Sequence, residues 1–315
     1  MAEFDLIERF RRAAGDADRE TVLGIGDDAA ILDIPQGRQL VATTDTLNSG
    51  VHFPDNATAA DIGHKALAVN LSDLAAMGAE PRWVLLSLSM PRGDMDFADG
   101  LIEGFMSLAR EVPVSLVGGD TCSGPLSVTV TALGLAPAGG ALQRSGARDG
   151  DLVVVSGVPG LAGFGLRQIG EGLEPGPDLI QALHRPIPRV ALGAALVGKA
   201  SACIDISDGL LADLGHIVEA SGCGAEIRLD RLPRHQSLEG LGEPDRWRLQ
   251  LTGGDDYELC FTLPERHAEL LDDLAVTGGA GLTVIGWMRG GPEIRCLAPD
   301  GGSFEAGSAG YEHFT

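Results

Sequence analysis

The chain has 315 residues, which favours two domains, and its 44% hydrophobic content is enough to bury a core. Its 45 acidic and 23 basic residues give a formal charge of −22, which repels nucleic acid and anionic membranes and excludes both as expected partners. Five scattered cysteines without a C-x-x-C pair, no long apolar run and no signal-peptide pattern predict a cytoplasmic protein.

The first half of the chain predicts a mixed α+β domain. Helical periodicity covers residues 3–14, about 59–77 and about 97–110. Apolar, β-like runs occupy residues 29–34, 40–44, 83–90, 114–117 and 126–135. The breaker-rich segment 136–140 then predicts a domain boundary, which divides the chain into residues 1–138 and 139–315.

The second half alternates between strands and helices and predicts another α+β domain. Its strands are expected near 152–156, 225–229, 258–262 and 282–288. Its helices are expected near 161–170, 178–184, 189–199 and 210–220.

Aspartates set among glycines and small residues recur at six places in the chain. These are residues 24–28, 43–46, 70–73, 118–121, 205–209 and 253–256. Hard cations such as Mg²⁺ prefer oxygen ligands and are commonly held by a few carboxylates together with substrate phosphates. The six motifs therefore favour a phosphate-handling metal site, although any single one could be an ordinary Gly-Asp turn.

Asp73 lies on the apolar stripe of the helix predicted at 59–77, one turn after Ile62, Ala66 and Val69. A carboxylate on an inward stripe is costly unless it is paired or metal-bound, so the position favours a ligand role over a buried cap. Asp61 and Lys65 on the same helix are predicted to form a solvated salt bridge.

Further polar residues outside that helix are candidates for the same chemistry. Ser207 or Asp208 could cap the helix that follows, but capping needs one side chain, and the additional Asp205 favours metal binding. His52 is a candidate phosphate or substrate contact, and Arg144 is either a phosphate contact or a linker arginine in solvent. The G-x-x-x-x-G-K-[ST] loop does not occur, so a nucleotide must be held in another way.

These motifs, with Lys65-Ala66-Leu67-Ala68-Val69-Asn70-Leu71-Ser72-Asp73 and Asp256-Tyr257-Glu258-Leu259 among them, together resemble thiamine-monophosphate kinase over nearly the whole chain. That family belongs to the aminoimidazole-ribonucleotide-synthetase-like ATP enzymes. The resemblance implies ATP-dependent phosphorylation of thiamine monophosphate with several Mg²⁺ ions. It also implies a homodimer whose N-terminal sheets pair into a shared barrel, next to a C-terminal α+β domain.

The resemblance also implies residue roles at matching positions. The implied Mg²⁺ ligands are Asp28, Thr43, Thr44, Asp45, Asp73, Asp120, Asp205 and Asp208. The implied ATP contacts are Gly119, Asp120, Arg144 and Ser207, and the implied substrate contacts are His52, Asp255 and Tyr311. Asp255 replaces a common Glu and Thr43 a frequent Ser, and both changes retain the oxygen ligand.

The function expected from these features is direct phosphoryl transfer, in which alignment and charge neutralisation dominate. Two other functions stay open. A related enzyme of the superfamily could activate an amide or selenide with ATP, although Tyr311 and the His52 loop favour the thiamine substrate. A regulator that binds nucleotide or cations without turnover is a third possibility, which the presence of all six acidic motifs disfavours.

Overall fold

The computed structural model describes residues 3–15, 18–54, 56–91 and 94–307. The chain divides into two compact units, one formed by residues 1–74 with 79–139 and the other by residues 75–78 with 140–315. Each unit combines a mixed sheet with helices, which confirms the predicted α+β class and two-domain organisation. No helix in the described part of the chain is long and apolar enough to span a membrane.

The first unit is built on a four-stranded mixed sheet with the order β3-β6-β4-β5. Strands β3 and β4 both pair antiparallel with β6, whereas β4 and β5 run parallel. The strands are β3 (Arg38–Asn48), β4 (Glu80–Met90), β5 (Ser115–Ser123) and β6 (Ser127–Pro137), and β1 (Thr21–Leu23) and β2 (Ile31–Leu32) form a separate hairpin. The helices are α1 (Glu3–Ala14), α2 (Ala59–Ala76) and α3 (Met95–Glu111).

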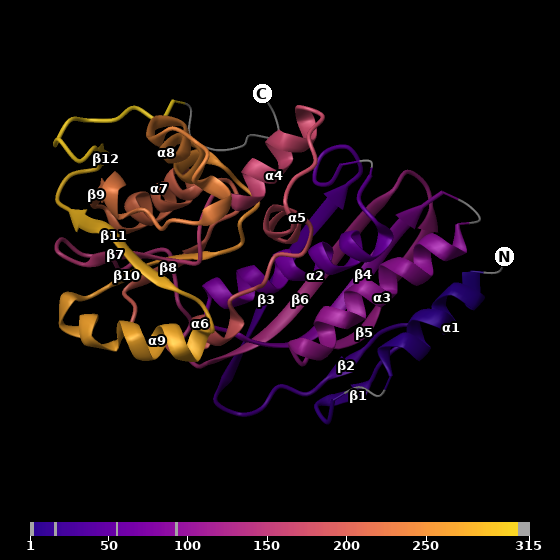
Figure 1. Ribbon diagram of the computed structural model, residues 1–315. Coiled ribbons are helices and arrows are strands. Elements are labelled where there is room, and N and C mark those ends of the chain that lie inside the picture. The colour runs from indigo at the N-terminus through magenta and orange to yellow at the C-terminus, as the bar shows by residue number, and fades with distance from the viewer. Residues whose placement is uncertain (1–2, 16–17, 55, 92–93, 308–315) are drawn as a thin grey trace. The chain divides into compact units, whose positions relative to one another are not determined.

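Helices α2 and α3 lie on one face of this sheet (Figure 1). They approach each other at two glycines. A Cβ on Gly63 would lie 2.0 Å from the Leu101 carbonyl oxygen, and one on Gly104 would lie 1.9 Å from that of Ala60. Only glycine permits so close an approach of the two helices. Most residues of α2 are buried, and apolar residues occupy most of its circumference.

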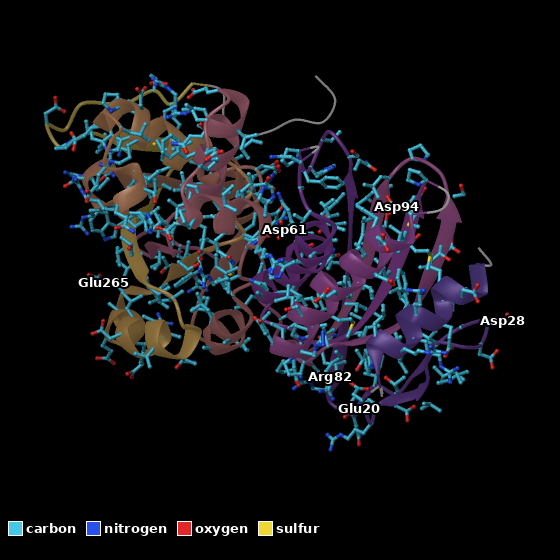
Figure 2. All side chains as sticks on the ribbon, turned by 45° about the vertical axis from the view of Figure 1, so that its right-hand side comes forward. Glu20, Asp28, Asp61, Arg82, Asp94 and Glu265 are labelled. Carbon is cyan, nitrogen blue, oxygen red and sulfur yellow. The ribbon has the colours of Figure 1, made fainter. Side chains whose placement is uncertain are left out.

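The β1–β2 hairpin is anchored to β4 by a polar cluster. The Arg82 guanidinium donates to Glu20 at 2.5 Å, and the two side chains lie next to each other in Figure 2. The Trp83 indole donates to the Thr21 hydroxyl at 3.0 Å. These contacts position the hairpin loop that carries Asp28, which is exposed.

Two predictions for the first unit were wrong in extent. The strand expected at 29–34 is reduced to Ile31–Leu32, because its partner β1 has only three residues. The strand expected at 114–117 continues to Ser123, so Gly118, Gly119 and Asp120 lie within β5 rather than in a turn after it. Pairing with β4 along this stretch outweighs the low strand propensity of glycine.

The second unit has a six-stranded sheet with the order β12-β9-β11-β7-β10-β8, in which only the β12–β9 pair is parallel. The strands are β7 (Leu152–Ser156), β8 (Ala202–Asp205), β9 (Gly224–Arg228), β10 (Leu259–Leu263), β11 (Leu282–Arg289) and β12 (Ile294–Leu297). The helices are α4 (Leu161–Gly170), α5 (Pro177–His184), α6 (Val190–Leu196), α7 (Leu210–Ser221), α8 (Glu243–Thr252) and α9 (Leu271–Gly278).

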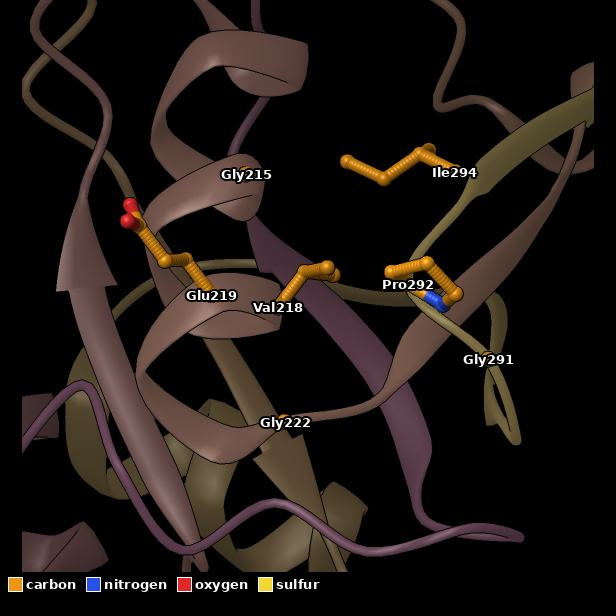
Figure 3. A pocket seen from close by; sticks show the side chains of 7 residues that line it. All are labelled: Gly215, Val218, Glu219, Gly222, Gly291, Pro292 and Ile294. Carbon is orange, nitrogen blue, oxygen red and sulfur yellow. The ribbon is translucent and has the colours of Figure 1, made fainter.

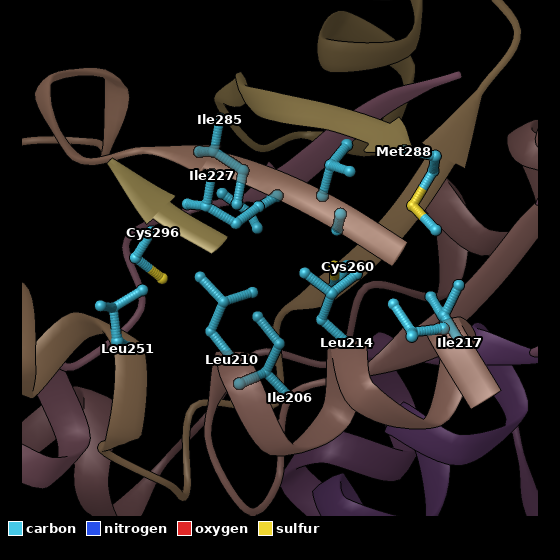
Figure 4. Packing of buried hydrophobic residues seen from close by; sticks show 14 of the residues in the cluster. Ile206, Leu210, Leu214, Ile217, Ile227, Leu251, Cys260, Ile285, Met288 and Cys296 are labelled. Carbon is cyan, nitrogen blue, oxygen red and sulfur yellow. The ribbon is translucent and has the colours of Figure 1, made fainter. Parts of the chain in front are cut away.

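Both faces of this sheet are covered, so its central strands are apolar throughout. On β7, Val153 and Val155 pack with α7, in the cluster that Figure 4 shows, and Leu152 and Val154 face the opposite side with residues of α6 and α9. Successive strand residues point to opposite faces, so a two-sided core requires a continuous apolar run. The predicted strand at 152–156 is confirmed for this reason.

Several elements of the second unit were not predicted. Strands β8 and β12 have only four residues each, and α8 is mostly polar. In α8 the buried positions include Arg246 and Gln250, whose side chains are hydrogen-bonded to each other at 3.0 Å. A polar residue at a core position removes the apolar periodicity by which a helix is recognised.

Candidate functional site

Three predicted site residues, Thr43, Asp45 and Asp73, meet Asn70 where β3 faces α2. Thr43 and Asp45 alternate on β3 and so share one face, and Asn70 and Asp73 lie three residues apart on α2. The Thr43 hydroxyl donates to Asp73 Oδ2 at 2.5 Å, and the Asp45 N–H donates to Asn70 Oδ1 at 3.1 Å. The Asn70 amide in turn donates to the Ala66 carbonyl at 3.0 Å, which fixes its orientation.

The two carboxylates of this group repel each other. Burial raises the pKa of Asp45 to about 6, and the charge of Asp73 adds to the shift. A cation at this position would favour both ionised forms. Two carboxylates and a hydroxyl are oxygen donors suited to Mg²⁺, which usually completes its octahedral shell with water and phosphate.

The described residues contain no larger group of metal-binding side chains than this one. No group of three or more His, Cys, Asp or Glu side chains there is placed to hold a metal ion.

Thr44 belongs to the opposite face of the sheet. Its hydroxyl donates to the Val130 carbonyl and lies 3.1 Å from the Thr131 hydroxyl. Thr131 also lines a cavity of about 1110 Å³. The same cavity is lined by three further predicted residues, Asp28, Gly119 and Asp120. The metal-binding residues predicted in this unit thus form two groups on opposite faces of the sheet, because successive side chains of β3 point to opposite faces.

Gly119 has a structural role within β5. Its φ of 146° lies in the region that favours glycine, and a Cβ there would lie 1.8 Å from the Leu86 carbonyl oxygen. The close approach of β4 therefore requires glycine at this position, and it places the neighbouring Asp120 opposite Ser87 at the cavity.

The predicted substrate contact His52 lies in a closed loop after β3. Its Nδ1 accepts from the Asn48 N–H at 3.0 Å, so Nδ1 is the unprotonated ring nitrogen. Its carbonyl accepts from Lys65 Nζ at 3.2 Å.

Lys65 is only 2% exposed, so the prediction that its charge lies in solvent was wrong. Because α2 is enclosed by the sheet and α3, even its lysine is buried.

In the second unit, Asp205 ends β8 and is followed by the loop that leads into α7. Asp213 Oδ2 accepts from the backbone N–H groups of Ser207, Asp208 and Gly209 at 3.0, 3.1 and 3.1 Å. Burial raises the pKa of Asp213 to about 7, the charge of Asp208 adds to this, and the three hydrogen bonds oppose it. A single carboxylate thus accepts hydrogen bonds from three consecutive residues of the loop.

The predicted substrate residue Asp255 lies beside this loop. The Asp255 N–H donates to the Ser207 carbonyl, and the Tyr257 N–H to that of Ile206, both at 2.8 Å. Asp255 and Tyr257 have φ values of 71° and 52°, which are strained for residues other than glycine. The Tyr257 hydroxyl donates to Asp255 Oδ1 at 2.9 Å, so the carboxylate has a defined orientation.

Arg144 lies at the other end of α7 from Ser207. The Ser221 hydroxyl, in the last residue of α7, donates to the Arg144 carbonyl at 3.2 Å. Ser207 precedes the helix, whose 12 residues rise by about 18 Å. The backbones of these two predicted ATP contacts are therefore well separated within the second unit.

A smaller hollow of about 540 Å³ lies beside the second half of α7 (Figure 3). Glu219 is its only charged lining residue among those described. The other lining residues are Gly215, Val218, Gly222, Gly291, Pro292 and Ile294. None of the predicted site residues is among them, so this hollow is not part of the candidate site.

Three residues that support these groups were not predicted individually. Asn70 could have been recognised, because it lies one turn before Asp73 on the same face of α2. Asp213 and Tyr257 carry no such signal, since their partners are set by the tertiary fold. The remaining predicted residue, Tyr311, lies outside the described residues.

The Asp45 shift predicts a pH-dependent stability. Because the folded pKa of about 6 exceeds the ordinary value of about 3.9, the folded state binds the proton more tightly. Without metal, the contribution of Asp45 to the free energy of unfolding is complete below about pH 4. This contribution falls by about 1.4 kcal/mol for each pH unit as the pH rises from about 4 to about 6. Melting curves in chelator should show this loss for wild type relative to Asp45→Asn, and Mg²⁺ should reverse it. Identical pH profiles for the two proteins would contradict the assignment.

Comparison with known proteins covers both units. The family model of AIR synthase related protein, N-terminal domain, matches residues 26–136, and that of the C-terminal domain matches residues 148–297. The thiamine-monophosphate kinase of Salmonella typhimurium is 43% identical over 318 residues, which cover 99% of this chain and 98% of that protein.

Solved structures of the same fold agree. The crystal structure of thiamine-monophosphate kinase from Stenotrophomonas maltophilia K279a is 45% identical, with a TM-score of 0.88 over 96% of this chain and 98% of that one. AaThiL complexed with AMPPCP and TMP is 30% identical, with a TM-score of 0.78 over 99% and 97% of the two chains. Because the similarity extends over both units and nearly the full length of these relatives, the chain belongs to the thiamine-monophosphate kinase family of AIR synthase related proteins.

Proposed function

We propose that this protein transfers the γ-phosphoryl group of ATP to thiamine monophosphate, which gives thiamine diphosphate and ADP. The observation that carries the proposal is the full-length similarity to thiamine-monophosphate kinases, 43% identical in one case, together with a relative that was solved with AMPPCP and TMP. AMPPCP is an analogue of ATP, so the two ligands of that relative correspond to the two substrates of the reaction.

The acceptor chemistry agrees with the polar groups of the first unit. A phosphate monoester is largely ionised near neutral pH, since its second pKa is about 6, so the acceptor needs no strong general base. The main obstacle is repulsion between two anions, and the chain has to align them and offset their charge. Lys65 lies on the same helix as Asp73 and donates to the His52 carbonyl, so a positive charge is present on this helix.

The Mg²⁺ ions of this proposal would be held by oxygen donors of both units. These are Asp28, Thr43, Thr44, Asp45, Asp73 and Asp120 of the first unit and Asp205 and Asp208 of the second. Bound Mg²⁺ would supply charge neutralisation of the phosphates. Support comes from the raised pKa of Asp45, which a bound cation would relieve.

The proposed ATP contacts are Gly119, Asp120, Arg144 and Ser207, and the proposed substrate contacts are His52, Asp255 and Tyr311. Support for Asp120 comes from its place in the 1110 Å³ cavity. Support for Asp255 comes from its strained backbone, because strain of this kind is concentrated at functional sites.

The proposal includes a homodimer in which the first units join their sheets into a barrel. Its support is strand β3, which has 11 residues and lies at the edge of its sheet. A long edge strand presents N–H and C=O groups that a second copy can pair with. We also propose a cytoplasmic location, because all five cysteines are free thiols, as reducing compartments maintain.

A coupled ADP-release assay with and without thiamine monophosphate tests the function. We expect ADP release that depends on this acceptor and on Mg²⁺, and no label on the protein after incubation with γ-labelled ATP alone. Equal ADP release without acceptor, or a phosphoprotein that thiamine monophosphate discharges, would refute the proposed reaction.

Tyr311→Ala is expected to raise the KM for thiamine monophosphate by roughly three- to thirtyfold, because an aromatic face attracts the cationic thiazolium ring. The KM for ATP should be nearly unchanged, and Tyr311→Phe should have a mild effect. Steady-state kinetics with each substrate varied in turn measure both constants. Equal losses for the two substrates, or a lower Tm with unchanged KM, would assign Tyr311 to packing.

A further inference from the structure

We propose that Asp213 is a positioning residue for nucleotide binding, which occupies the N–H groups of the loop before α7 and fixes this loop, which carries Ser207 and Asp208. The proposal rests on the proposed function in that it takes Ser207 and Asp208 as ligand-binding residues. It adds a residue that holds one side of the backbone of the loop that carries their side chains.

The geometry of Asp213 differs from an ordinary helix cap. The residue before α7 is Gly209, which has no side chain to accept the free N–H groups. Asp213 instead turns back from the first turn of the helix, and its Oδ2 accepts from three consecutive N–H groups at 3.0 to 3.1 Å. The residue is only 2% exposed, so these bonds are protected from water.

The hydrogen bonds to Asp213 limit what the loop before α7 can bind. Free N–H groups at a helix N-terminus form a ready anion site, and many phosphate-binding loops use them. In the loop that leads into α7, the N–H groups of Ser207, Asp208 and Gly209 already bind an internal carboxylate. A phosphate at the same place would lose these donors and would meet a like charge. Ser207 and Asp208 therefore act on the nucleotide through their side chains.

The loop is held from its other side as well. The Ser207 carbonyl accepts from the Asp255 N–H at 2.8 Å, and the Ile206 N–H donates to the Glu258 carbonyl at 2.8 Å. Ser207 and Asp208 remain partly exposed between these supports. Because the loop backbone is bonded on both sides, the positions of the two side chains depend on Asp213 and on the segment that carries Asp255.

The test compares Asp213→Asn and Asp213→Ala with wild type, and it uses Glu219→Gln as the control. Glu219 is an exposed acid on the same helix, so Glu219→Gln repeats the change of charge without touching the loop. Measurements are the KM for ATP, the KM for thiamine monophosphate, the Mg²⁺ concentration at half-maximal rate, and binding of Mg-AMPPCP. Hydrogen exchange of the Ser207, Asp208 and Gly209 amides reports the loop directly.

For both Asp213 variants we expect faster exchange at these amides, and a KM for ATP and a Kd for Mg-AMPPCP that rise by about tenfold or more. The Mg²⁺ requirement should rise with them, whereas the KM for thiamine monophosphate should change much less. Glu219→Gln should behave as wild type.

Unchanged exchange in Asp213→Ala, or a lower Tm with equal changes in both KM values, would overturn the positioning role. If wild type gives no ADP release with thiamine monophosphate, the proposed function fails. The exchange and Mg-AMPPCP measurements still decide the role of Asp213 in that case, because neither depends on turnover.

Discussion

Asp73→Asn is expected to leave a folded protein and to lower kcat by about 10³-fold or more. The amide has nearly the same shape as the carboxylate and can still accept from the Thr43 hydroxyl, which Asp73 Oδ2 does at 2.5 Å. It lacks the negative charge that would hold a cation between Asp73 and Asp45. The kcat and the Mg²⁺ dependence of ADP release measure the effect.

The control for this prediction is Glu103→Gln. Glu103 is an exposed acid on α3, so the same chemical change occurs in the same unit away from the β3–α2 group. Its kcat should equal that of wild type, and both variants should melt within a few degrees of it. Activity of Asp73→Asn within about tenfold of wild type would contradict a metal-binding role.

Arg189→Met is expected to destabilise the second unit by about 3 to 5 kcal/mol. Arg189 Nε donates to Glu258 Oε2 at 2.7 Å, and its Nη2 donates to Glu258 Oε1, so the pair is bidentate. The Ser156 hydroxyl donates to the same carboxylate. The side chains of Arg189 and Glu258 are only 14% and 11% exposed, so the substitution would leave a buried carboxylate without its countercharge.

Chemical denaturation measures this loss as a change in the free energy of unfolding. The double variant Arg189→Met with Glu258→Gln should regain a large part of it, because the amide needs no countercharge. Arg148→Met, which removes an exposed arginine, should change stability by less than about 0.5 kcal/mol. A similarly small effect of Arg189→Met would show that water or another cation replaces the guanidinium.

Elements with a strong local signal were predicted from the sequence with accurate bounds. Strand β7 and helix α4 lie where the apolar run and the helical periodicity placed them. Helix α2 also agrees, although its apolar surface extends nearly all round rather than along one stripe. In each case the signal lies in consecutive residues, as a continuous apolar run for β7 and as helical periodicity for α4 and α2, so local patterns are sufficient.

The acidic motifs and the family resemblance were likewise available from the sequence, and they identify the family and the reaction. What the sequence could not indicate is which side chains share a surface. Thr43 and Thr44 are neighbours in the chain and were assigned one role, yet strand alternation directs Thr43 to Asp73 and Thr44 to Thr131.

Lys65, Gly119 and Asp213 show how much the tertiary structure decides. Lys65 is buried because α3 and the sheet enclose its helix. Gly119 lies within β5 because β4 approaches to a distance at which only glycine fits. Asp213 accepts hydrogen bonds from three N–H groups because the loop after β8 lies against the start of α7. The sequence by itself thus determined the α+β class and the family, and it indicated the chemical types of the proposed site residues. Only the tertiary structure decided their faces, burial and partners, because these depend on contacts between segments that are distant in the chain.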